Sequence, residues 1–188
     1  KIIALSTDKA CDPINLYVAN TLIKENILPF TPSDRDVTDW QKDNGILARK
    51  DINNVTTILC TGSHLRSQAL KVTPAHIKKY EPFMNNFWKT ICLIDGFGKE
   101  KAKSKIVAAQ PVVLKALAKL SHDLAYGHSN IKDEEGYKKL NLAIRSREID
   151  FSHTNNIWRA LFCNNDERKQ NYPGIENFVY VADEINLD

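Results

Sequence analysis

The clearest pattern along the chain is a helical repeat of apolar positions in residues 106–127. Leucine and valine recur there every three or four residues, at Val113, Leu117, Leu120 and Leu124. This spacing places them on one stripe of a helix. Pro111 is expected in the first turn, where a missing N–H is tolerated, and Gly127 is expected to end the helix. The pattern predicts a helix from about Pro111 to Gly127.

Five further segments show helical periodicity and predict most of the remaining fold. Residues 73–93 begin with a Thr–Pro pair typical of a helix N-terminus, and Pro82 is expected to kink this helix or divide it in two. In residues 51–70, Asp51 is the expected cap and Gly62 is expected to weaken the middle of the helix. The other three segments are residues 13–26, 33–44 and 133–146.

Signals for β-strands are confined to the two ends of the chain. Residues 1–5 and 177–182 are apolar or β-branched enough for short strands. Residues 28–32, 95–105 and 164–174 have the proline, glycine and polar content of loops. We therefore predict a mainly α fold over residues 1–188, a single helical lobe of about six helices with the option of short terminal strands.

Composition indicates an ordinary globular chain and excludes one that is disordered throughout. Of 188 residues, 43% are hydrophobic and 26% are charged, and 26 Lys and Arg against 23 Asp and Glu give a net charge of only +3. No apolar run approaches the roughly 18 residues that span a bilayer. The chain opens on Lys1 and runs directly into an apolar stretch, as expected for a domain cut from a longer protein. We expect a cytoplasmic domain with no membrane partner.

The four cysteines indicate neither a metal site nor a disulfide framework. Cys11, Cys60, Cys92 and Cys163 are far apart, and none belongs to a CxxC or CxxH pair. Cys60 and Cys92 lie in apolar stretches, where a thiol behaves as a small core side chain. Reduced and inert thiols are expected, with no bound metal.

Motifs that indicate an enzyme are missing from the chain. The sequence contains no GxSxG, GxxxxGK[ST], HExxH or GxGxxG motif, and residues 95–98 (DGFG) are better explained as a turn. The five histidines lack the spacing of a metal site or a catalytic triad; they are His64, His76, His122, His128 and His153. We predict no catalytic site and no cofactor in this chain.

Positive charge is concentrated in residues 99–119. Six lysines against Glu100 alone give this stretch a charge of +5, so the remainder of the chain, with +3 in total, is slightly acidic. Because phosphate contacts require localised cations, we predict a nucleic-acid-binding surface here. Its members are Lys99, Lys101, Lys103, Lys105, Lys115, Lys119 and His122. The alternative is a solvated loop that only keeps the domain soluble.

Residues 149–158 (IDFSHTNNIW) place short polar side chains between bulky apolar ones. Such side chains satisfy local backbone groups and cap helices, so a buried polar corner that locks two helices and caps a following helix (residues 158–163) is favoured over a ligand site. Asp150 or Ser152 is also expected to pair with Arg147 or Arg159. The motif residues are Asp150, Ser152, Asn155 and Trp158.

This segment resembles the I-D-W-S-R-x-N-P-x-W stretch near the C-terminus of the DndB-like proteins, the DGQHR-domain group. Phe151, His153 and Asn156 depart from that pattern, whereas the other matched positions agree; these are Ile149, Asp150, Ser152, Asn155 and Trp158. Three shorter pieces are also similar to the family: VVLKALAKLSHDLAYG, the spaced residues Tyr137, Leu140 and Ile144, and the opening IALST.

The resemblance implies a bacterial protein that binds DNA and regulates transcription of genes for DNA sulfur (phosphorothioate) modification. The DGQHR motif of the family lies in an N-terminal half and does not occur here. The chain would then be the C-terminal helical part, with DNA and its own N-terminal domain as partners and no catalytic residue carried over. The alternative is a helical protein–protein interaction or homo-oligomerisation domain with no DNA contact, which docks through Phe83, Phe87 and Trp88.

Overall fold

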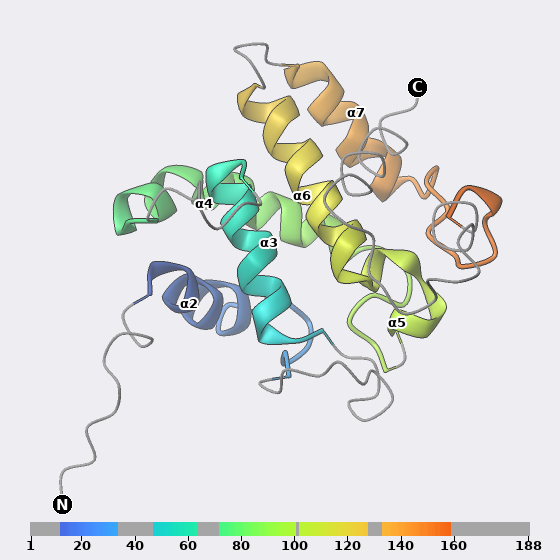
Figure 1. Cartoon of the computed structure of the whole chain (residues 1–188), viewed down its shortest axis with the longest axis horizontal. Coiled ribbons are helices and arrows are strands. Elements are labelled where there is room, and N and C mark those ends of the chain that lie inside the picture. The colour runs from blue at the N-terminus through green and yellow to red at the C-terminus, as the bar shows by residue number, and fades with distance from the viewer. Residues whose placement is uncertain (1–11, 34–46, 64–71, 101, 128–132, 159–188) are drawn as a thin grey trace, which may run out of the picture.

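The computed structural model describes residues 12–33, 47–63, 72–100, 102–127 and 133–158, and this part of the chain is mainly helical (Figure 1). The mainly α prediction is confirmed. The α-helices are α2 (Pro13–Tyr17), α3 (Arg49–Thr61), α4 (Pro74–Ile91), α5 (Ala102–Lys105), α6 (Pro111–Tyr126) and α7 (Glu134–Arg145). A π-helix η1 (Val18–Ile23) follows α2, and a 3₁₀-helix η2 (Val107–Ala109) precedes α6. The β structure of these residues is limited to two isolated bridges, Ser33–Ala48 and Ile106–Ser152.

Several predicted elements lie outside the described residues. These are both terminal strands, the helix of residues 33–44 beyond Ser33, the loop of residues 164–174, and the helix of residues 158–163 beyond Trp158.

Helix α6 lies at the centre of the fold and packs against α3, α7 and η2 (Figure 1). It begins at Pro111 and is followed by Gly127, as predicted. The buried surface of α6 extends beyond the predicted stripe, because neighbouring elements cover the helix on several sides. Small and apolar residues outside the stripe, including Leu114, Ala116 and Ala118, are fully buried.

Helix α3 differs from its prediction at both ends. Its N-cap is Ala48, and Asp51 lies inside the first turn. The helix ends at Gly62, which has a φ of 65° in the left-handed region and whose N–H donates to the carbonyl of Ile58. A glycine in this conformation closes a helix instead of weakening it, because it has no Cβ to strain.

Helix α4 continues through Pro82 without dividing into two pieces. Thr73 caps it as predicted: its Oγ1 accepts from the His76 backbone N–H, and His76 Nδ1 accepts from the Thr73 N–H. Pro82 is exposed, so its ring meets no neighbouring element and the carbonyl that loses its partner can bind water.

The first and last described helices also have identifiable caps. Asp12 Oδ1 accepts from Ile14 N–H and begins α2, and the segment then changes to a π-helix at Val18, where a single α-helix had been predicted. Asp133 accepts from Gly136 N–H and caps α7. Among the described residues no helix is both long and apolar enough to cross a membrane.

Candidate nucleic-acid interface

The lysine segment, residues 99–105, is a turn followed by the single helical turn α5. Lys99 and Lys105 are exposed, whereas Ala102 is only 2% exposed and fixes the segment to the core. The structure does not describe Lys101 or the side chain of Lys103. The predicted loop is therefore partly helical, and its two described lysines reach the surface.

The glycine-containing turn before this segment has a packing role. Gly96 and Gly98 have φ values of 85° and 72°. A Cβ on Gly98 would lie 2.2 Å from Phe30 Cδ1, and the Phe30 and Phe97 rings meet edge to face with centroids 5.9 Å apart. The turn buries Phe97 and so positions Lys99 directly after it.

The tertiary structure brings the lysine segment beside the polar corner, residues 149–158. Ile106 and Ser152 form an antiparallel bridge, and the Val107 N–H donates to the Phe151 carbonyl at 2.8 Å. Nothing in the sequence indicates this contact, because about 45 residues separate the two segments. These contacts place the polar corner next to the residues that directly follow the lysine segment.

Asp150 organises the polar corner and brings its predicted members together. Its carboxylate accepts from Ser152 N–H at 2.8 Å and from Ser152 Oγ at 3.0 Å. Its carbonyl accepts from Asn155 Nδ2 at 2.9 Å and from Trp158 Nε1 at 2.6 Å. The rings of Phe151 and Trp158 are buried and stack on each other. Asp150 itself is exposed, so the corner is less buried than predicted.

Arg147, one of the two expected partners of Asp150 or Ser152, pairs with neither of them among the described contacts. Its Nη2 lies 3.1 Å from Asp95 Oδ1, so it links the corner to the turn that precedes the lysine segment. Both side chains are more than 70% exposed, and the pair contributes little to stability. Arg159, the other predicted partner, lies outside the described residues.

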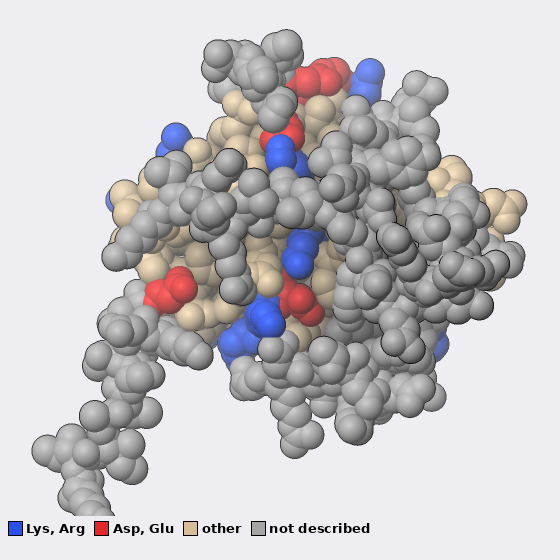
Figure 2. All heavy atoms as spheres, in the orientation of Figure 1, with Lys and Arg blue, Asp and Glu red and all other residues tan. Residues whose placement is uncertain are grey.

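Acidic side chains reduce the charge of this surface. Residues 95–105 and 145–152 together hold six Lys and Arg and four Asp and Glu, a net charge of +2. The face of the molecule in Figure 2 likewise shows acidic side chains next to basic ones. Four of the six cations have described side chains, and they are balanced by the four acidic residues; the excess of two comes from Lys101 and Lys103, whose side chains the structure does not describe.

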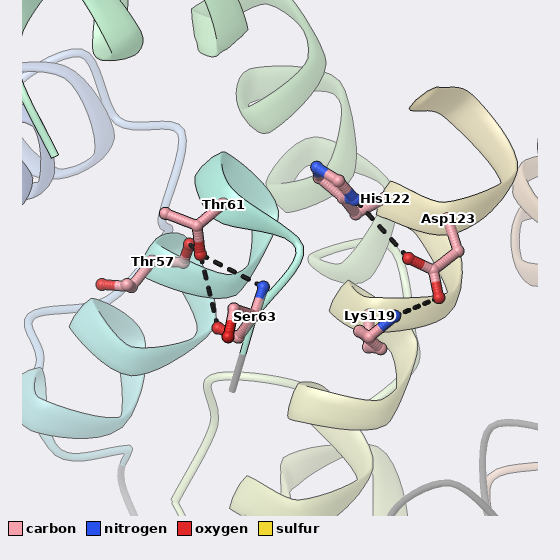
Figure 3. Close-up of polar contacts among 6 residues, drawn as sticks. All are labelled: Thr57, Thr61, Ser63, Lys119, His122 and Asp123. Carbon is pink, nitrogen blue, oxygen red and sulfur yellow. Dashed lines mark hydrogen bonds and ion pairs between the residues drawn. The ribbon is translucent and has the colours of Figure 1, made fainter. Parts of the chain in front are cut away.

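Lys119 and His122, two predicted members of the nucleic-acid-binding surface, are largely buried and lie beside Asp123. Their side chains are 18% and 12% exposed. Figure 3 shows both pointing toward Asp123: Lys119 Nζ pairs with Oδ2, and His122 Nδ1 lies 3.6 Å from Oδ1. The stripe that carries them faces α3, where a Cβ on Gly62 would lie 2.4 Å from His122 Cε1. Lys115, on the same stripe, is half-buried.

Asp123 is the residue of this cluster that sequence reasoning missed. Burial by itself would raise the pKa of its carboxyl, but the contacts and charges of His122 and Lys119 outweigh burial and lower it. The ionised carboxylate therefore neutralises Lys119. The i, i+4 spacing of Lys119 and Asp123 was the signal available in the sequence.

Figure 3 also shows the end of α3, where the hydroxyl of Thr61 bonds to groups of its own segment. Thr61 Oγ1 donates to the Thr57 carbonyl at 2.8 Å and accepts from the Ser63 N–H at 3.2 Å. The Thr61 hydroxyl thus provides hydrogen-bond partners for backbone groups at the end of the helix.

The described residues hold no group of three or more His, Cys, Asp or Glu that could bind a metal ion. Cys60 and Cys92 are free thiols, and burial raises the pKa of Cys60 to about 11 and that of Cys92 to about 12. Both thiols are therefore protonated and unreactive near neutral pH. Cys11 and Cys163 lie outside the described residues.

The aromatic side chains of α4 that were expected to dock a partner are part of the core. Phe83, Phe87 and Trp88 are 8%, 3% and 0% exposed. Phe83 contacts the Tyr126 and Tyr137 rings, which come from α6 and α7. These residues hold the chain's own helices together and offer no docking face.

No family model matches the chain, and no curated protein or solved structure is significantly similar to it. The resemblance to the DndB-like proteins thus rests on the short motifs alone and stays a prediction.

Proposed function

We propose that this chain is the C-terminal helical part of a bacterial DNA-binding regulator associated with DNA phosphorothioate modification. The observation that carries the proposal is the contact between the lysine segment and the polar corner, through the Ile106–Ser152 bridge and the Val107–Phe151 hydrogen bond. The most family-like segment of the sequence and its most basic segment thus support one surface.

The physical basis is a set of lysines held close to a rigid support. Lys99 and Lys105 are exposed on either side of the buried Ala102, so their ammonium groups are available to phosphates. Each phosphate contact would release condensed counterions and make the affinity depend on salt. Lys101 and Lys103 belong to the same segment of the sequence, and Lys115 is half-buried. We leave Lys119 and His122 out of the proposed phosphate contacts because both lie beside Asp123.

The test compares two double charge reversals on the same chain. Lys99→Glu with Lys105→Glu changes the proposed surface, and Lys78→Glu with Lys139→Glu makes the same charge change at exposed positions on α4 and α7. Binding to a labelled DNA duplex is measured by fluorescence anisotropy over a range of KCl concentrations. The first variant should bind much more weakly and lose about two units of the log–log salt slope, at about 0.9 per lost contact.

The control variant should retain the slope, and both variants should keep the helical circular dichroism spectrum. Equal losses in the two variants would show that only net charge matters and would remove the assignment. The alternative function is an interaction or oligomerisation domain, and the aromatic side chains that it was expected to dock through are buried in the core. A dimer in light scattering that ignores both salt and DNA would favour that alternative.

A further inference from the structure

A groove of about 450 Å³ opens where η1, α4 and α7 end, and it shares no residue with the lysine segment or the polar corner. The turn after η1 supplies Glu25 and Ile27, α4 supplies Asn85 and Lys89, and α7 supplies Arg145. The lining combines these polar side chains with apolar ones such as Ile27 and Leu93. The volume falls within the range of small-molecule sites, and the lining supplies several polar groups that can orient a ligand.

The amide of Asn85 has a fixed orientation. Its Oδ1 accepts from the Tyr17 hydroxyl at 2.5 Å, and Tyr17 is only 3% exposed. Burial, followed by the charges of Glu81 and Glu25, raises the pKa of the Tyr17 phenol, which therefore stays a donor. Because the amide oxygen is occupied, the Nδ2 group remains to donate to a ligand.

Arg145 is held in place by α4. Its Nε and Nη2 donate to Thr90 Oγ1 at 3.3 and 3.2 Å, and Nη2 also donates to Asn86 Oδ1 at 3.0 Å. Thr90 is 1% exposed, so it is a fixed acceptor. These bonds leave Nη1 of the guanidinium for a ligand, and they reduce the entropy that binding would cost.

Within the described part of the chain, the two cations of the groove have no carboxylate partner. Among the described residues no ion pair forms at Lys89 or Arg145, although both side chains line the same groove. Lys89 and Asn85 lie one helical turn apart on α4 and therefore share a face. Two like charges and an oriented amide on a shared lining are a donor set for an oxyanion.

We propose that this groove binds a small molecule that carries an oxyanion, a carboxylate or a phosphate, at Asn85, Lys89 and Arg145. Ile27 and Leu93 contact the apolar part of the molecule. Glu25, the one acidic residue that the described lining contains, accepts from an amine or hydroxyl group at the other part of the ligand. This site is independent of DNA binding by the lysine segment.

The test is a titration of the ¹⁵N-labelled chain with inorganic phosphate and, separately, with acetate, at constant ionic strength. The side-chain amide of Asn85 and the Nε–H of Arg145 are followed by nuclear magnetic resonance. Both signals should shift and saturate. The stronger of the two probes identifies the ligand as phosphate-bearing or carboxylate-bearing.

The variants Lys89→Gln and Arg145→Gln each remove one charged donor and should weaken binding of the probe about tenfold. Lys139→Gln makes the same charge change outside the groove and should leave the affinity unchanged. Lys89 has no structural partner among the described side chains, so Lys89→Gln keeps the test valid even if Arg145→Gln unfolds. Shifts that do not saturate, or that are equal in Lys89→Gln and Lys139→Gln, would overturn the proposal.

Discussion

Gly62, at the end of α3, packs directly against the His122 side chain of α6. Gly62 has a φ of 65°, and the space beside its Cα is filled by the imidazole of His122. His122 is held in turn beside Asp123 and near the Tyr126 ring, at a centroid distance of 5.3 Å. The glycine therefore permits both the end of the helix and the close packing of α3 on α6.

Replacing Gly62 by alanine should destabilise the fold by about 2 kcal/mol, since a left-handed residue with a Cβ is strained and the Cβ also overlaps the ring. Chemical denaturation measures the loss. Gly96→Ala is the matched control: Gly96 also has a positive φ, but its Cβ would meet only Ile106 Cγ2 at 3.9 Å. A loss no larger at Gly62 than at Gly96 would show that the contact with His122 costs nothing.

At the scale of an element, α6 combines a buried apolar surface with a charged cluster on the stripe that faces α3. Lys119, His122 and Asp123 occupy neighbouring positions of this helix, and Asp123 is the common partner of the other two. Asp123 offsets the cost of burying the Lys119 ammonium group, because a half-buried charge is unfavourable unless an opposite charge lies close to it. Because Lys119 and His122 are largely buried beside Asp123, they are less available to phosphate than the exposed Lys99 and Lys105.

The cluster makes the stability of α6 depend on pH in the acidic range. The pKa of Asp123 is lowered in the folded chain from its ordinary value of 3.8, so its contribution is fully present above that value. The contribution is lost as the pH falls through the lowered pKa. The free-energy difference between the unaltered chain and Asp123→Asn should therefore shrink from about pH 6 to about pH 2. A difference that stays constant over this range would contradict the ion pair.

At the scale of the whole molecule, folding redistributes the charge that the sequence concentrates in one stretch. Arg147 and Asp95 join the lysine segment, whereas Lys119 is neutralised by Asp123. Of the four lysines of residues 99–105 in the proposed DNA surface, the structure describes the side chains of Lys99 and Lys105, and both have acidic neighbours in the sequence or the fold, among them Glu100 and Asp150.

The unaltered chain should therefore bind duplex DNA with a log–log salt slope of about −3 to −4, from about 0.9 for each of four lysine contacts. Anisotropy titrations at several KCl concentrations measure this slope. A slope of about −5 or steeper would mean that Lys115 and Lys119 also contact phosphate. A slope near zero would contradict phosphate contact as the basis of binding.

Local patterns predicted the elements of the fold that depend on nearby residues. The repeat of leucines, Pro111 and Gly127 predicted α6 with correct bounds, and the Thr–Pro pair predicted the start of α4. Predictions of helix ends were wrong where one residue type can have two different effects on a helix. Glycine either weakens a helix or ends it, and the choice at Gly62 depends on whether the next residues continue the helix.

The candidate sites were less predictable than the fold. The sequence identified the members of the polar corner, but not the bridge between Ile106 and Ser152 that joins them to the lysine segment. It gave no sign of the groove, whose lining comes from Glu25, α4 and Arg145. Contacts between distant segments depend on how complete helices pack, which no local spacing records.

Taken alone, the order of residues determined that this chain is mainly helical, where its best helices begin, and where its lysines concentrate. These properties follow from backbone propensity and periodicity, which act over a few residues. Only the tertiary structure decided which charged side chains remain at the surface. Burial and pairing are properties of packed neighbours, so Lys119 and His122 face α3 while Lys99 and Lys105 remain exposed.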